Sequence, residues 1–128
     1  MRLSITVIDT PDPRASAAFY AALLDGEIEE SASDDDWVQL EGEDRGVAVL
    51  AFQRAPGLTP PSWPGDEHPM RVHVDVEADD LDAGQERVLA IGGRLAEHQP
   101  SARFRVFLDP LGHPFCLVLP RAVRRTLS

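Results

Sequence analysis

The side chains best suited to chemistry lie close together in the sequence, around His73. Arg71 precedes this histidine by two positions and Asp75 follows it by two. In an extended strand, residues two positions apart point to the same face, so the three side chains form one polar face. A histidine between an arginine and a carboxylate can act as a general acid or base near neutral pH. The pattern equally fits a histidine that only makes hydrogen bonds on a solvated sheet face, so both interpretations stay open.

Two further pairs of side chains could bind a ligand. Trp37 and Gln39 share one face of a predicted strand, where an aromatic wall and an amide would suit a planar organic molecule. Arg103 and Arg105 share one face of a later predicted strand. They could hold a carboxylate or phosphate, or they could pair with the many acidic residues of the chain.

The single cysteine, Cys116, lies inside an apolar run that extends from Pro114 to Leu119. A nucleophilic thiol needs a basic or helix-N-terminal environment, so the run favours a small buried hydrophobic side chain. One cysteine also excludes an internal disulfide and fits a reducing cytoplasm.

The sequence that positions these residues contains an internal repeat, two similar copies of one pattern of elements. Shifting residues 5–30 forward by 67 positions places Asp12 on Asp79 (79 − 12 = 67) and Gly26 on Gly93. Each copy has a short alternating run, an acidic helix start, a helical stretch and a closing glycine. Two similar βα units can build a sheet around a concave face, and that face is the natural place for a ligand.

Each copy predicts a βαβββ unit. In the first, a strand around residues 3–7 precedes a helix that opens at Asp12 and Pro13 and ends at Asp25 and Gly26. Its predicted buried stripe is Ala15, Ala18, Phe19, Ala22 and Leu23. Three strands should follow, at about Glu27–Glu30, Trp37–Glu41 and Gly46–Gln53. The second unit should contain a strand at Met70–Glu77, a helix capped by Asp79 and Asp80, and strands at Arg94–Glu97, Arg103–Leu108 and Pro114–Leu119.

Residues 55–69 join the two units and contain five prolines, which cannot sit in a central strand or a helix interior. This connector is either a stiff linker or a flap over the binding face, with Trp63 as its stacking surface.

Length and charge narrow the class of protein. A chain of 128 residues is long enough for one domain with a real core. With 22 acidic and 12 basic residues, the net charge of −10 disfavours nucleic acid or an anionic membrane as partner. All the basic residues are arginine, which excludes Schiff-base chemistry on a lysine.

The order of these motifs resembles the vicinal oxygen chelate superfamily, in particular its small glyoxalase-like domains. The resemblance rests on Asp12-Pro13-Arg14 with Phe19-Tyr20, the connector around Trp63, the segment His73–Val76, and the run from Asp109 to Cys116. It implies an α+β fold, in which two βαβββ modules form a curled mixed β-sheet with a central cup, often in a homodimer. The superfamily includes lyases, isomerases, dioxygenases and non-catalytic drug binders, so the fold alone does not set the function.

The resemblance also indicates which positions would hold the ligands of a metal ion. Metal-using members place a ligand on the first strand of each unit and a glutamate on a last strand. Here these positions hold His73, Thr6 (or Ile5, if the register slips by one) and Cys116. Catalytic zinc wants three protein ligands, and non-haem iron wants two histidines and a carboxylate. We therefore expect no obligatory metal or other cofactor; His73, with Asp75 on the same face, would be the main ligand of any metal that binds.

The sequence thus predicts one glyoxalase-like domain over residues 1–128, with modules at about 1–54 and 70–120, the connector 55–69 and a C-terminal tail at 121–128. The predicted protein is a cytoplasmic homodimer that binds a small, planar or aromatic molecule in its cup and uses His73 as a catalytic or anchoring residue. The predicted ligand-binding residues are Thr6, Trp37, Gln39, Trp63, Arg71, Asp75, Arg103, Arg105 and Cys116. The alternatives are a metal-dependent lyase, isomerase or dioxygenase, and a non-catalytic regulatory or interaction domain.

Overall fold

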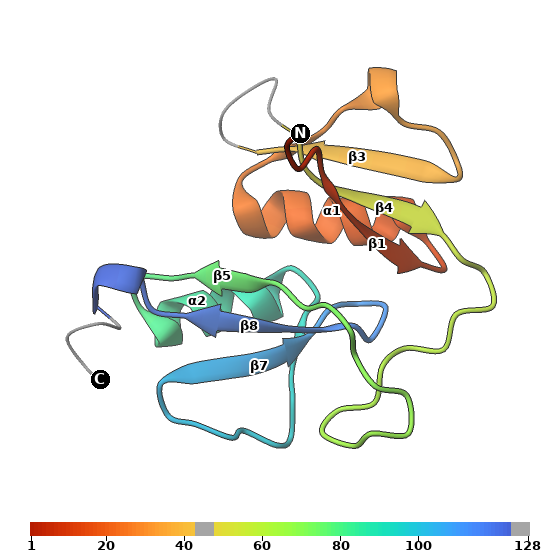
Figure 1. Ribbon diagram of the computed structural model, residues 1–128. Coiled ribbons are helices and arrows are strands. Elements are labelled where there is room, and N and C mark those ends of the chain that lie inside the picture. Colours follow the sequence, from red (N-terminus) through yellow and green to blue (C-terminus); the bar gives the residue numbers. More distant parts are fainter. Residues whose placement is uncertain (43–47, 124–128) are drawn as a thin grey trace. The chain divides into compact units, whose positions relative to one another are not determined.

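The computed structural model describes residues 1–42 and 48–123 (Figure 1). The chain divides into two compact units, Met1–Thr59 and a second that begins at Pro60. Their boundary falls inside the predicted connector, residues 55–69. Each unit contains an α-helix beside a four-stranded mixed sheet, so the α+β class and the repeated βαβββ order are confirmed. The strands form two sheets, one in each unit, rather than one continuous sheet.

The first unit has its strands in the order β1-β4-β3-β2. Its elements are β1 (Thr6–Thr10), α1 (Pro13–Leu24), β2 (Glu27–Ile28), the 3-10 turn η1 (Glu30–Ala32), β3 (Trp37–Glu41) and β4 (Ala48–Arg54). β1 pairs in parallel with β4, and the other two pairs are antiparallel. The predicted strand at Glu27–Glu30 is therefore only two residues long, since the chain turns at η1. The predicted start of the fourth strand, Gly46, lies outside the described residues.

Local signals explain where α1 begins and ends. The carboxylate of Asp12 accepts a hydrogen bond from the backbone N–H of Ala15 at 3.1 Å, and Pro13 occupies the first turn. The helix ends at Asp25, whose φ of 53° is left-handed. At Gly26, a Cβ would lie 2.4 Å from the carbonyl oxygen of Glu41, so only glycine lets the chain pass this close to β3.

The core of the first unit lies between α1 and its sheet. Val38 and Phe52 are fully buried, and the ring of Tyr20 stacks on that of Phe52 with centroids 5.4 Å apart. The predicted helix stripe is wrong at Ala18, which is exposed. Ser16, by contrast, is buried, because its hydroxyl hydrogen-bonds that of Thr10 on β1 at 2.8 Å and turns this face of α1 toward the sheet.

The second unit repeats the arrangement with strands in the order β5-β8-β7-β6. Its elements are β5 (Asp75–Glu77), α2 (Leu81–Ala90), β6 (Arg94–Leu95), β7 (Phe104–Leu108) and β8 (Pro114–Val118). Asp80 caps α2 by accepting hydrogen bonds from the backbone N–H groups of Asp82 and Ala83.

The predicted strand Met70–Glu77 is wrong over residues 70–74, which lie outside β5. This stretch follows Pro69, and the described contacts hold it by isolated bonds instead of a ladder. The backbone N–H of Cys116 donates to the carbonyl of Val74 at 3.1 Å, and the ring nitrogen Nε2 of His113 lies 3.0 Å from the carbonyl oxygen of Val72. The chain carrying His73 is thus fastened on both sides without being part of a strand.

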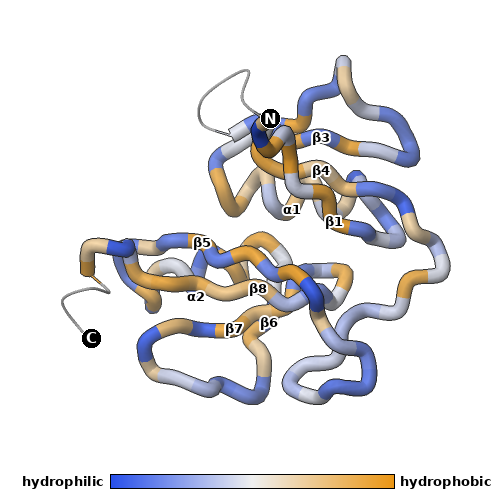
Figure 2. The backbone as a smooth tube through the Cα atoms, in the orientation of Figure 1, coloured by the Kyte–Doolittle hydropathy of each residue, from blue (hydrophilic) through white to orange (hydrophobic). Residues whose placement is uncertain are grey.

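β8 is buried on both faces and runs through the second unit as a hydrophobic segment (Figure 2). On one face its Phe115 ring stacks on that of Phe107, with centroids 5.7 Å apart. On the other face, a second apolar cluster consists of Ala96, Val106, Cys116 and Val118, against which Trp63 and Phe104 pack. The sheet of this unit therefore has an apolar surface on the side that also carries Asp75. No helix in the described part of the chain is long and apolar enough to cross a membrane.

Candidate functional site

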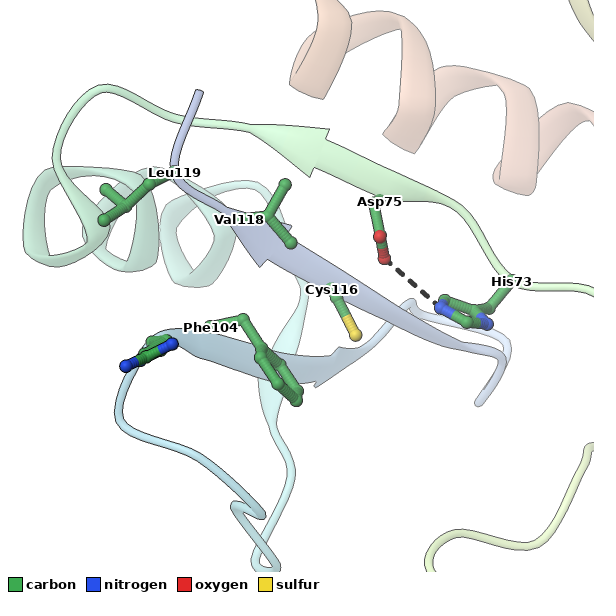
Figure 3. Close-up of a pocket in the computed structure, with 7 residues that line it drawn as sticks. His73, Asp75, Phe104, Cys116, Val118 and Leu119 are labelled. Carbon is green, nitrogen blue, oxygen red and sulfur yellow. Dashed lines mark ion pairs between the residues drawn. The ribbon is translucent and has the colours of Figure 1, made fainter. Parts of the chain in front are cut away.

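The second unit contains an open cavity of about 290 Å³ on the face of its sheet that carries Asp75 (Figure 3). It is lined by His73, Asp75, Arg103, Phe104, Cys116, Val118 and Leu119. A cavity of this size is at the lower end of those that hold small organic ligands. Four residues predicted to bind a ligand or act on it therefore meet here: His73, Asp75, Arg103 and Cys116.

Strand register explains why residues so distant in sequence are neighbours. Asp75 on β5 pairs with Cys116 on β8, and Cys116 in turn pairs with Val106 on β7. Directly paired residues point to the same face of a sheet. Phe104 and Val118 form the next pair on that face, two residues further along. The cavity is thus a strip across three strands.

Asp75 is the polar centre of the cavity. Its Oδ1 lies 3.2 Å from Nε2 of His73, and its carboxylate also accepts a hydrogen bond from the thiol of Cys116. Burial, the negative charge of Asp75 and this hydrogen bond, in that order, raise the pKa of the Cys116 thiol from 9.0 to about 11. Cys116 is therefore protonated at neutral pH and is no nucleophile there.

A second cavity of about 170 Å³ adjoins the first, because both are lined by His73, Phe104 and Cys116. Trp63 and Met70 also line it. The predicted connector thus contributes Trp63 to a cavity wall, which is the arrangement expected of the flap interpretation.

The segment that carries Trp63 closes on itself into a loop. The backbone N–H of Ser62 donates to the carbonyl of His68 at 2.7 Å, and the N–H of His68 donates to the hydroxyl of Ser62 at 2.9 Å. The indole N–H of Trp63 donates to the carbonyl of His98 at 3.5 Å, so this wall is held by packing and one long hydrogen bond.

The sequence leaves two roles open for Arg103 and Arg105, a shared ligand site or pairing with acidic residues. Arg105 takes the second, since its guanidinium donates to the carboxylate of Asp82 at 2.6 Å. Arg103 lines the cavity, whereas the guanidinium of Arg105 donates to the carbonyl of Leu81 at 3.1 Å and to Gln85 at 3.0 Å, both in α2. Within β7, Arg105 alternates with Phe104 and Val106, whose side belongs to the cavity. Arg105 therefore fastens the helix to the sheet.

Trp37 and Gln39 belong to the first unit, whereas the cavity is built by the second alone. They alternate with the buried Val38, as predicted, and take part in a series of side-chain hydrogen bonds. The indole N–H of Trp37 donates to Gln39 at 3.3 Å, and the amide of Gln39 donates to Glu29 at 2.9 Å. Arg71 is exposed and lines neither cavity.

Comparing the registers of the two sheets identifies the first-unit counterpart of His73. In the first sheet, Trp37 at the start of β3 pairs with Gln53, which pairs with Asp9 on β1. The corresponding row of paired residues in the second sheet starts at Phe104, the first residue of β7, and continues through Val118 to Glu77 on β5. The first strands are therefore offset by 68 residues (77 − 9 = 68), and His73 corresponds to Ile5 (73 − 68 = 5). The sequence offset of 67, which points to Thr6, is wrong for this strand.

Thr6 accordingly points to the opposite face. It alternates with the exposed Val7 and lies on the side of Ile8 and Thr10, toward the core of the first unit. The placement of Thr6 gives no support for a role beside Trp37 and Gln39.

The same comparison tests whether the metal arrangement implied by the fold fits these residues. The counterparts of Asp75 and Cys116 are Val7 (75 − 68 = 7) and Ala51, which pairs with Val7 as Cys116 pairs with Asp75. Neither can bind a metal, nor can Ile5. An arrangement with ligands from both units therefore does not fit. What remains is one set in the second unit, in which donor atoms of His73, Asp75 and Cys116 lie within 4.8 Å of one another.

The sequence did not point to the apolar lining. Phe104, Val118 and Leu119 looked like ordinary core residues, because alternation does not tell which face of a strand meets the helix. The sequence offered a signal for one of them: Val118 lies two positions after Cys116 and therefore on the same face of the strand, the face away from α2.

Comparison with known proteins identifies the family to which the chain belongs. A family model described as a glyoxalase-like domain matches residues 5–118. A search of curated proteins found no match.

Solved structures share the fold. A fosfomycin resistance protein from Mesorhizobium loti is 19% identical, with a TM-score of 0.65 over 98% of this chain and 97% of that one. A glyoxalase/bleomycin resistance protein/dioxygenase family enzyme from Burkholderia phytofirmans is 19% identical, with a TM-score of 0.62 over 91% and 97%. A bleomycin-binding protein in complex with bleomycin is 21% identical, with a TM-score of 0.58 over 94% and 100%. The family match covers most of the chain, and these folds agree with it: the chain belongs to the glyoxalase-like domains of the vicinal oxygen chelate superfamily.

Proposed function

We propose that this chain binds a small organic molecule with a planar or aromatic body in the cavity of its second unit, and that binding needs no metal. The observation that carries the proposal is the cavity itself, in which an apolar wall meets the polar pair of His73 and Asp75, 3.2 Å apart. Apolar lining with a few converging polar groups is the usual composition of a small-molecule site.

The chemistry of the lining supports this class of ligand. The ring of Phe104 points into the cavity beside Cys116 (Figure 3) and offers an aromatic contact. His73, half-exposed, offers a hydrogen bond at the edge. Two structural neighbours are named for fosfomycin resistance and for bleomycin binding, so small-molecule recognition occurs on this fold. These neighbours support the class of function and not the identity of the ligand.

His73 is also the residue we propose for any catalysis. Asp75 can orient its imidazole and stabilise the imidazolium form, which is how carboxylates support a histidine base. Cys116 remains protonated and takes no covalent part. The function is therefore either sequestration of the ligand or a proton transfer assisted by His73.

A second candidate is a metal-dependent lyase, isomerase or dioxygenase, and the donor set of His73, Asp75 and Cys116 favours it. Nitrogen, oxygen and sulfur donors in threes suit zinc, which would supply a Lewis acid. A non-haem iron site is disfavoured, because such sites use two histidines. The test is elemental analysis after purification without chelators. We expect less than stoichiometric zinc, iron, nickel or manganese; about one metal per chain, lost in His73→Ala, would establish the second candidate instead.

The main proposal is tested by ligand binding to protein freed of metal. Planar acids, phenols and aromatic antibiotics are screened by quenching of tryptophan fluorescence, and the hits are titrated calorimetrically. We expect His73→Ala to weaken binding by about 5- to 30-fold, the worth of one hydrogen bond to a partly buried group. His68→Ala is the matched control, because His68 is exposed and lines neither cavity. Equal affinities for wild type and both variants would place the ligand elsewhere.

The third class, a regulatory or interaction domain with a vestigial cup, gains no support from the second unit, because its cavity is open and not packed with side chains. We further propose that the protein works as a homodimer in the cytoplasm. The homodimer follows from the family resemblance, and the location from the single, reduced cysteine.

A further inference from the structure

We infer that the ligand is an aromatic monoacid, whose carboxylate binds Arg103 and whose far end carries a neutral polar group that meets His73 and Asp75. This inference rests on the proposed function, because it assigns a chemical class to the same cavity. Three observations on the lining carry it: an unpaired cation at one end, an apolar middle, and an anion at the other end.

The cation is Arg103. Its side chain is exposed at the cavity, and within residues 1–42 and 48–123 its guanidinium has neither an ion pair nor a hydrogen bond. This is notable in a chain with a net charge of −10. Arg14, Arg54 and Arg105 are each paired with a carboxylate. An unpaired guanidinium beside a cavity is suited to the bidentate binding of a carboxylate.

The middle of the cavity is apolar. Phe104, Val118 and Leu119 separate Arg103 from the polar end. A ligand that covers these side chains removes water from around its own acid group, so its attraction to Arg103 exceeds that of a pair on the open surface. An aromatic ring matches this strip, because it can pack against the ring of Phe104.

The far end carries a negative charge. Asp75 lies one pair of residues further along the strands than Val118, a step of about 7 Å. One aromatic ring is long enough to cover the pair Phe104–Val118 that lies next to Asp75 on this face. The carboxylate of Asp75 lies 3.2 Å from Nε2 of His73 and accepts a hydrogen bond from Cys116, so it can accept one from a hydroxyl of the ligand but repels a second acid group. The cavity should therefore prefer a monoacid to a diacid.

The probes are 4-hydroxybenzoate, its neutral analogue 4-hydroxybenzamide and the diacid terephthalate, titrated calorimetrically at pH 8. We expect the monoacid to bind at least about tenfold more tightly than either analogue, since hydrogen bonds to charged groups are the stronger ones. Arg103→Gln should remove this advantage over the amide and leave the affinity for the amide unchanged. Arg71→Gln is the matched control, because it removes the same charge from an exposed residue that lines neither cavity.

Two outcomes overturn the inference. In one, the amide or the diacid binds as tightly as the monoacid, or Arg103→Gln behaves like Arg71→Gln; the proposed function survives this if His73→Ala still weakens every probe. In the other, none of the three probes binds although the wider screen finds a neutral ligand sensitive to His73→Ala. Failure of the proposed function looks different, because no compound would then respond to His73→Ala. Unfolding curves of the variants verify that each is folded.

Discussion

Among single residues, Asp75 has the widest influence, because its carboxylate lies 3.2 Å from Nε2 of His73 and accepts a hydrogen bond from the thiol of Cys116. Toward His73 it acts as an orienting carboxylate. Toward Cys116 it acts as a charge that opposes ionisation, together with burial. The same carboxylate thus favours acid–base chemistry and disfavours thiol chemistry at one site.

The raised pKa of Cys116 predicts how stability depends on pH. In the unfolded chain the thiol ionises near its ordinary pKa of 9.0, whereas in the folded protein it does so near pH 11. Stability from this group is thus fully present below pH 9 and is lost as pH rises toward 11, because only the unfolded state then releases a proton. Between pH 8 and about pH 10.5, wild type should lose about 2 kcal/mol more unfolding free energy than Cys116→Ala. Urea unfolding measures this difference, and parallel pH profiles of the two proteins would contradict it.

At the scale of elements, close contacts between helix and sheet set the geometry of each unit. In the second unit, Arg105 ties β7 to α2 through the carbonyl of Leu81 and the side chain of Gln85. That attachment turns the other face of β7, with Phe104 and Val106, toward the cavities. In the first unit, Gly26 allows the segment after α1 to pass next to β3.

The contact at Gly26 predicts that Gly26→Ala destabilises the protein. The new Cβ would lie 2.4 Å from the backbone oxygen of Glu41 and 3.3 Å from a methyl group of Leu40, so a strand must shift to make room. We expect a loss of about 1–3 kcal/mol in the free energy of unfolding. Gly57→Ala, in the same unit, has no atom within 4 Å of the added Cβ and should be nearly neutral. Equal stabilities of the two variants in urea unfolding would show that the contact is not tight.

At the scale of the molecule, the chain consists of two units of one pattern that have diverged in chemistry. In the second unit one sheet face carries His73, Asp75 and Cys116; at the equivalent positions the first unit has Ile5, Val7 and Ala51. Each sheet also ends in a very short strand, β2 or β6. A very short edge strand discourages pairing with another chain, so these edges do not point to a dimer interface.

We predict a homodimer from the family resemblance. Sedimentation at micromolar concentration should give about twice the chain mass of 14.0 kDa, because homo-oligomers of this kind close with twofold symmetry. Dilution over about a hundredfold range should leave that mass unchanged if the interface is extensive. A mass of one chain throughout the range would refute the dimer.

The sequence by itself determined what depends on neighbours along the chain. Asp12 and Asp80 cap helices as expected, and β3 has the predicted limits Trp37–Glu41. Capping and strand alternation are local, so a repeated βαβββ pattern can be recognised without a structure. The chemistry of His73 and Asp75 was also visible, since two residues two positions apart share a face.

Only the tertiary structure decided what depends on pairing between distant segments. Asp75 meets Cys116 across 41 positions (116 − 75 = 41), and the register of that pair makes Ile5, and not Thr6, the counterpart of His73. The structure also decided which face of β7 meets α2 and where β7 begins, so Arg105 contacts α2 while Arg103, in the bend before the strand, lines the cavity. The physical reason is the same in both cases: alternation gives a strand two faces, and a shift of one residue exchanges them, so packing against a helix must choose between the two.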